Sequence, residues 1–151
     1  MSRFVIVLVL LVLVIGVPTA GRVSADSSLQ QAIAITWFPR YDDADLHAIA
    51  HERASELAAC ECLDHDGMRS GTAEVIAFNQ GYPDSLAHVV GQWRTSADHN
   101  AILGNRSYGR IGCAEVVSDD VHWFACVLGF GELPPAPAPV LLPNTALPAE
   151  R

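Results

Sequence analysis

The chain has 151 residues, of which 50% are hydrophobic and 17% are charged. This length is typical of a single domain with a buried core. All nine basic residues are arginines, and they are outnumbered by 17 acidic residues, so the formal net charge is −8. A surface of this sign repels phosphate backbones, and the sequence contains no cluster of basic residues to offset it. Composition therefore excludes nucleic acid as a partner.

The first 25 residues have the features of a signal peptide. Arg3 supplies a positive charge, residues 4–17 are apolar apart from Gly16, and Val23-Ser24-Ala25 offers small residues to a signal peptidase. The apolar run is shorter than a membrane-spanning helix of about 20 residues, so a cleaved signal is favoured over a stable transmembrane anchor. We therefore expect a secreted or cell-envelope protein that begins at Asp26 and carries a net charge near −10.

The C-terminal segment, residues 133–151, is rich in proline. Proline lacks a backbone N–H and favours extended polyproline conformations, so we predict a disordered tail. The folded domain is then expected within residues 26–132. The prolines of the tail are Pro134, Pro135, Pro137, Pro139, Pro143 and Pro148.

Three helical segments are expected in the folded region. Residues 29–38 are compatible with a helix that Pro39 ends. Apolar residues at helical spacing predict an amphipathic helix over Asp45–Ala59, and acidic residues precede it where they suit its positive end. Pro83-Asp84-Ser85 is a helix start signal, followed by an apolar stripe that reaches Trp93. Residues 101–103 are expected to continue as a short turn.

Strands are predicted between and after these helices. Residues 73–78 are short, apolar and compatible with a strand. Residues 111–117 and 122–128 are also typical of strands, and Ser118-Asp119-Asp120-Val121 between them indicates a turn. Helices interleaved with a small, mostly antiparallel sheet predict an α+β sandwich.

Four cysteines in an exported chain indicate disulfides. A hairpin centred on Asp119-Asp120 places Cys113 directly opposite Cys126, which predicts a cross-strand disulfide between them. Cys60 and Cys62 remain. A bridge between these two would close a tight, strained ring that geometry does not favour, so their pairing stays open. The sequence lacks the CxxC-like pairs of a four-cysteine zinc site.

The histidines differ in their sequence surroundings. His47 and His51 are four residues apart on the first amphipathic helix, a spacing that lets two imidazoles share a metal. Glu52 follows the second histidine instead of the first, and position 55 is serine, so the zincin motif is absent. We interpret both side chains as solvated or partly covered. His88 and His122 have no partner in the sequence and are assigned no role.

His65 and His99 each lie in a longer phrase. The first is Cys62-Leu63-Asp64-His65-Asp66-Gly67, with Glu74 nine residues after the histidine. The second spans residues 93–103 (WRTSADHNAIL) and is followed by Arg110-Ile111-Gly112 and an aromatic strand. This order resembles the bacterial branch of the CAP superfamily, also called SCP-like (cysteine-rich secretory proteins, antigen 5, pathogenesis-related 1). The resemblance covers about residues 46–130, and the phrase from Trp93 to Leu103 is its most specific part.

The resemblance implies a three-layer α-β-α sandwich with a central cleft. In the family this cleft holds two histidines and, in many members, two glutamates, and some members bind a divalent metal there. By match, His65 and His99 are the two histidines and Glu74 is the first glutamate. Ser96 stands in place of the second glutamate and would line the cleft. The phrase around Glu74 lacks the usual glycine and asparagine, and the Asn-x-x-Arg phrase of the family's first helix is not found, so a full four-residue chemistry does not follow.

Three functions remain open. The favoured one is a non-catalytic binding module for an unknown apolar small molecule or protein, with Zn²⁺ or another divalent cation at His65, Glu74 and His99 as an option. Two imidazoles and a carboxylate leave one metal position open, so a metal-dependent extracellular hydrolase is an alternative, although no separate general base can be named. A cell-wall-associated structural protein is the third. Ser96 and His99 share a helix face, but no nucleophile elbow or oxyanion donor accompanies them, and no catalytic residue is assigned.

Overall fold

The computed structural model describes residues 24–25 and 27–136. Most of the predicted signal peptide and of the proline-rich tail lies outside the described residues, so neither prediction is tested. None of the helices in the described part of the chain combines the length and the apolar composition that a membrane crossing requires. The elements in chain order are β1 (Ser24–Ala25), α1 (Ser27–Thr36), β2 (Tyr41–Asp42), α2 (Ala44–Cys60), β3 (Thr72–Gln80), α3 (Ser85–Thr95), α4 (Ala97–Gly104), β4 (Arg110–Ser118) and β5 (Val121–Gly129).

The strands form one mixed sheet in the order β1-β4-β5-β3, with β2 added beside β4. β3 pairs antiparallel with β5 over its full length, and β5 pairs antiparallel with β4. The two-residue strands β1 and β2 both pair with β4, β1 antiparallel and β2 parallel. Within the described residues, β3 therefore forms one edge of the sheet. β1 belongs to the predicted signal peptide, so cleavage after Ala25 would remove this strand and leave the three long strands intact.

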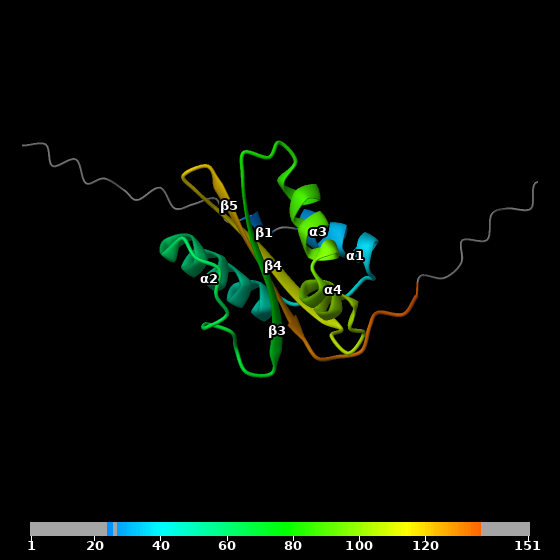
Figure 1. Cartoon of the computed structure of the whole chain (residues 1–151). Helices are drawn as coiled ribbons and strands as arrows, with labels where there is room; N and C mark the ends of the chain where they lie inside the picture. Colours follow the sequence, from blue (N-terminus) through cyan, green and yellow to red (C-terminus); the bar gives the residue numbers. More distant parts are fainter. Residues whose placement is uncertain (1–23, 26, 137–151) are drawn as a thin grey trace, which may run out of the picture.

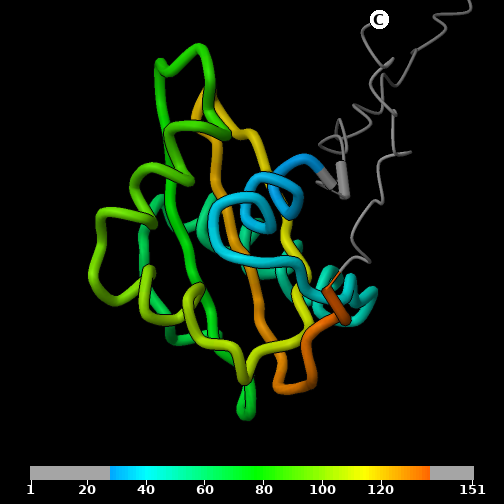
Figure 2. The backbone as a smooth tube through the Cα atoms, turned by 90° about the vertical axis from the view of Figure 1, so that its right-hand side faces the viewer, coloured from blue at the N-terminus to red at the C-terminus, as the bar shows by residue number. Residues whose placement is uncertain are grey.

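Helices cover both faces of the sheet (Figure 1). α2 packs on one face through Leu46, Ala50, Ala54 and Leu57, which meet Ile76, Trp123 and Val127 of the sheet. α1, α3 and α4 pack on the other face, the one turned toward the viewer in Figure 2, and contribute Leu29, Ile33, Val89, Trp93 and Leu103 to a second core. The predicted three-layer α+β sandwich is confirmed.

The predicted helix boundaries have visible chemical causes. The Asp43 carboxylate accepts hydrogen bonds from the backbone N–H groups of Asp45 (3.0 Å) and Leu46 (3.1 Å), which caps the first turn of α2. Asp84 caps α3 in the same way, through a 3.0 Å bond from the Ala87 N–H. The helix predicted over Asp45–Ala59 is confirmed to within one residue at each end.

The predicted hairpin between β4 and β5 is also confirmed. Its two turn residues, Asp119 and Asp120, have φ values of 50° and 62°, the left-handed pair of a type I′ turn. This turn pairs Ser118 with Val121 and places Cys113 opposite Cys126, where a disulfide joins them with a Cα–Cα distance of 4.1 Å.

Two local features differ from expectation. The segment around residues 101–103 is a full helix, α4, because the Asn100 N–H donates to the Ser96 carbonyl and starts the helix directly after Ser96. Cys60 and Cys62 form a disulfide with a Cα–Cα distance of 5.2 Å, against the geometric expectation. Glu61 between them takes a left-handed φ of 51°, which ends α2 and turns the chain so that the two cysteines approach each other.

Candidate functional site

A cleft of about 560 Å³ runs along the outer edge of β3. Its floor is formed by five consecutive residues of that strand, Ile76 to Gln80. Leu63 from the α2–β3 loop (residues 61–71) and Tyr82 from the β3–α3 connection stand at its sides. The wall opposite is formed by side chains of α3, of α4 and of the residue between them: His88, Gln92, Trp93, Ser96 and His99. Two of the predicted cleft residues, Ser96 and His99, therefore line this cleft.

The other two predicted residues, His65 and Glu74, contact each other. The Nδ1 of His65 lies 2.9 Å from Oε1 of Glu74. The Glu74 side chain is only 1% exposed, whereas the His65 side chain is 50% exposed. Glu74 comes from β3 and His65 from the α2–β3 loop, so this pair ties the loop to the sheet.

Arg53 of α2 completes this cluster and is absent from the sequence prediction. Its Nε donates to Oε2 of Glu74 at 2.9 Å, and its Nη2 donates to the backbone carbonyl of Asp64 at 2.8 Å. A further ion pair joins Arg53 to Glu56. Burial by itself would lower the pKa of Arg53, but the hydrogen bonds and charges of Glu74 and Glu56 outweigh burial and raise it.

The sequence around Arg53 carries two signals of a buried functional arginine. The arginine sits three residues after Ala50, which reproduces the spacing of the Asn-x-x-Arg phrase with alanine in place of asparagine. It also interrupts an apolar stripe whose members, Ala50, Ala54 and Leu57, are all buried. A charged residue on such a stripe requires a buried partner of opposite charge, and Glu74 is that partner.

His99 is held at the junction of α3 and α4. Its ring lies 6.5 Å from the Trp93 ring, centroid to centroid, and the two rings are tilted. Burial, followed by the charge of His65, lowers the pKa of His99, while the charge of Asp98 partly opposes this shift. The cleft therefore favours a neutral imidazole at this position.

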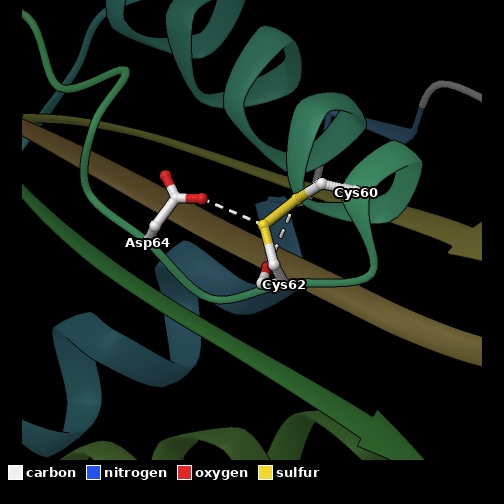
Figure 3. Close-up of side chains that lie close together, drawn as sticks. All are labelled: Cys60, Cys62 and Asp64. Carbon is white, nitrogen blue, oxygen red and sulfur yellow. Dashed lines mark hydrogen bonds between the residues drawn. A yellow bond between two sulfur atoms is a disulfide. The ribbon is translucent and has the colours of Figure 1, made fainter.

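The described residues do not bring His65, Glu74 and His99 together as a three-ligand metal site. Among them, the group of histidine, cysteine or acidic side chains whose ligand atoms all lie within 4.8 Å of one another is Cys60, Cys62 and Asp64 (Figure 3). Both cysteine sulfurs belong to the disulfide, so neither can act as a thiolate ligand or donate a proton. The 2.9 Å approach of the Asp64 Oδ2 to the Cys62 Sγ is therefore a contact without a shared proton.

His47 and His51 do not form a metal site either. The Nδ1 of His47 lies 2.8 Å from the Cys113 carbonyl, and its Nε2 lies 2.7 Å from Oδ1 of Asp42. The side chain is 18% exposed, as expected of a partly covered histidine. These contacts engage both ring nitrogens of His47 in holding α2 against the sheet.

Neither a family model nor the sequence of a curated protein matches the chain. Several solved structures match the fold of this chain. An outer surface protein from Borrelia burgdorferi matches with a TM-score of 0.59 at 21% identity, over 74% of this chain and 99% of that one. An extracellular protein containing a SCP domain from Bacillus anthracis matches with a TM-score of 0.53 at 13% identity, over 69% of this chain and 41% of that one.

A cysteine-rich secretory protein from Staphylococcus aureus matches with a TM-score of 0.50 at 17% identity. The match covers 67% of this chain and 36% of that one. The chain thus spans nearly all of the Borrelia protein and well under half of the other two. These structural matches establish a shared fold. At identities this low they carry no ligand or activity over to this chain. The chain has the fold of the SCP domain, as its resemblance to the CAP superfamily implies.

Proposed function

We propose that the protein is an exported binding module that holds an apolar small molecule or protein segment in the cleft beside β3. The observation that carries this proposal is the lining of the cleft: Leu63, Phe78 and Tyr82 are large, apolar and 48%, 46% and 51% exposed there. A cleft of about 560 Å³ is within the size range of ligand sites. Export is supported by the two disulfides, which form in oxidising compartments.

A non-catalytic role is supported by the engagement of the Glu74 carboxylate. A general base needs a free lone pair within reach of a substrate proton. Both oxygens of Glu74 are already bonded, one to Arg53 and one to His65, and Glu74 is buried. Ser96 stands where many related sequences carry the second glutamate, so no second carboxylate is supplied there. We infer that His65, Glu74 and Arg53 hold the α2–β3 loop in place, and that His99 and Ser96 contribute to the polar wall of the cleft.

The arrangement of His65, Glu74 and His99 also does not fit a divalent cation. His65 and Glu74 direct ligand atoms at each other, and the ligand atoms of His65, Glu74 and His99 are not gathered within 4.8 Å. Titration calorimetry with Zn²⁺ is therefore expected to give weak binding at most, equal in the natural protein and in a His65→Ala/His99→Ala variant. Tight binding that the double variant loses would contradict this view and would favour the metal-dependent hydrolase.

The apolar cleft is tested with a neutral fluorescent probe, N-phenyl-1-naphthylamine, because an anionic probe would be repelled by a chain of net charge −8. We expect saturable binding that Tyr82→Ala weakens by about tenfold, since burial of a large side chain contributes about 1.5 kcal/mol. Ile35→Ala is the matched control, because Ile35 is an 80% exposed apolar residue on α1, away from the cleft. Equal loss in both variants, or no saturable binding, would contradict the proposal.

A further inference from the structure

The hairpin turn determines which backbone groups of β3 face outward. In a two-residue hairpin the closing pair, here Ser118 and Val121, exchanges both of its hydrogen bonds across the β4–β5 ladder. Bonding direction alternates along a strand, so the even-numbered residues of β5 bond to β3. The register pairs Asn79 with His122 and Ala77 with Phe124. The odd-numbered residues of β3 therefore bond to β5, and the even-numbered residues direct their N–H and C=O groups away from the sheet.

Two hydrogen bonds agree with this assignment. The Trp93 Nε1–H donates to the Ile76 carbonyl at 3.1 Å, and the Thr72 N–H donates to the Arg69 carbonyl at 3.2 Å. The Ile76 carbonyl and the Thr72 N–H both belong to even-numbered residues of β3, and both point out of the sheet. Further along the strand, the outward N–H and C=O groups of Phe78 and Gln80 have no partner among the described residues, and both residues are exposed.

These free groups belong to two residues that line the apolar cleft. Phe78 and Leu63 line the cleft along β3 and also a second hollow of about 230 Å³ on the α2 side of the strand. Two acidic residues, Glu61 and Asp119, line that second hollow. The edge of β3 thus presents unpaired backbone donors and acceptors, apolar side chains on each side, and negative charge at one end.

We propose that residues 78–80 of β3 bind an extended peptide segment of a partner protein as an additional strand of the sheet. Main-chain bonds to Phe78 and Gln80 would supply affinity, and alternate side chains of the peptide would enter the two hollows. The partner's peptide segment carries apolar residues and a lysine or arginine that reaches Glu61 and Asp119. This inference rests on the proposed function and names the class of partner.

Two other occupants fit less well. A second copy of the chain would bring together two molecules of net charge −8. The chain's own residues 133–151 contain six prolines, and each of these lacks the N–H that an added strand must donate.

The test uses a six-residue peptide with blocked ends and alternating valine and lysine, titrated into the exported protein. Gln80→Pro removes the outward N–H of Gln80 and leaves the β3–β5 ladder bonds in place, because Gln80 does not bond to β5. We expect Gln80→Pro to bind the peptide at least tenfold more weakly than the matched variant Gln80→Ala, which also lacks the glutamine side chain but keeps the backbone N–H. Peptide binding should also slow hydrogen exchange at the Phe78 and Gln80 amides. An unchanged thermal unfolding midpoint in both variants shows that the fold is kept.

Each other outcome has a definite meaning. Equal binding by Gln80→Pro and Gln80→Ala would overturn strand addition, as would exchange that the peptide leaves unchanged. Equal binding of a valine–glutamate peptide would overturn the role of Glu61 and Asp119. If the neutral naphthylamine probe binds and the peptide does not, the inference fails and the proposed function stands. If neither binds, both fail.

Discussion

Arg53 and Glu74 form an ion pair that is buried on both sides, with side chains 5% and 1% exposed. Two further contacts around this pair hold the α2–β3 loop. The His65 ring contacts the Glu74 carboxylate, and Arg53 donates a hydrogen bond to the Asp64 carbonyl. The loop also packs closely over the arginine, since a Cβ on Gly67 would lie 2.2 Å from Nη1 of Arg53. This residue pair therefore anchors the loop that carries Leu63 to the cleft.

The first prediction concerns this pair. Glu74→Gln removes the charge opposite a buried guanidinium, and breaking a buried pair in this way costs about 3 kcal/mol. The control is Glu52→Gln, which breaks the pair of Glu52 with Arg69, whose side chains are 52% and 54% exposed. That change should cost well under about 1 kcal/mol. Urea unfolding of the two variants measures the difference, and equal costs would contradict the central role of Glu74.

The second prediction concerns His99, whose pKa is lowered in the folded protein by burial and by the charge of His65. The unfolded chain then binds a proton more readily than the folded one. The stabilisation is fully present above the unfolded pKa near 6.5 and is lost as pH falls through the lower folded value. His99→Gln should therefore flatten the fall in thermal midpoint below about pH 6.5. An unchanged profile in His99→Gln would contradict the assignment.

At the scale of elements, α2 and β4 approach each other at Gly112, the glycine of the Ile-Gly phrase. A Cβ at this position would lie 2.1 Å from the backbone N of His47 and 2.2 Å from the backbone C of Leu46. The atoms in the way are backbone, so no side-chain rotation relieves the clash. The first turn of α2 is in turn held by the Asp43 cap and by the bond of His47 to Cys113.

The third prediction follows from this contact. Gly112→Ala should destabilise the protein by about 3 kcal/mol or prevent its folding, since overpacking a core costs about 1–3 kcal/mol and backbone atoms cannot move aside. Gly91→Ala on α3 is the matched control, because nothing lies within 4 Å of a Cβ there. That variant should be slightly more stable, by about 0.5–1 kcal/mol. Thermal unfolding of both variants separates the two effects, and equal midpoints would contradict the close approach.

At the scale of the whole molecule, features set by local chemistry could be predicted from sequence. The apolar period of α2, its acidic cap and the Asp119-Asp120 turn each depend on neighbouring residues, and all three are confirmed. Arg53 could not be placed in this way, because its partner Glu74 is 21 residues away and meets it only after α2 packs on the sheet. α4 was underestimated for a related reason: an eight-residue helix is marginal alone and is stabilised here by burial of Leu103.

The two disulfides complete the molecule in different ways, and the fourth prediction separates them. Cys113 and Cys126 are both 0% exposed, whereas Cys60 is exposed and Cys62 is half-buried. Mild treatment with dithiothreitol should therefore open Cys60–Cys62 first and leave the sandwich folded. Peptide mapping after alkylation with iodoacetamide measures the order, and simultaneous alkylation of all four cysteines would contradict it.

Their contributions to stability should also differ, because a disulfide constrains the unfolded chain more when it closes a longer loop. Cys113–Cys126 spans 13 positions and Cys60–Cys62 spans two. Replacing Cys113 and Cys126 by alanine should cost about 3 kcal/mol of unfolding free energy, and replacing Cys60 and Cys62 clearly less. The smaller bridge would then serve mainly to fix the turn at Glu61 and so the start of the loop that leads to Leu63. In that case the Cys60→Ala/Cys62→Ala variant should lose affinity for the naphthylamine probe although its thermal midpoint falls less than that of Cys113→Ala/Cys126→Ala. A purely stabilising disulfide would not produce this separation.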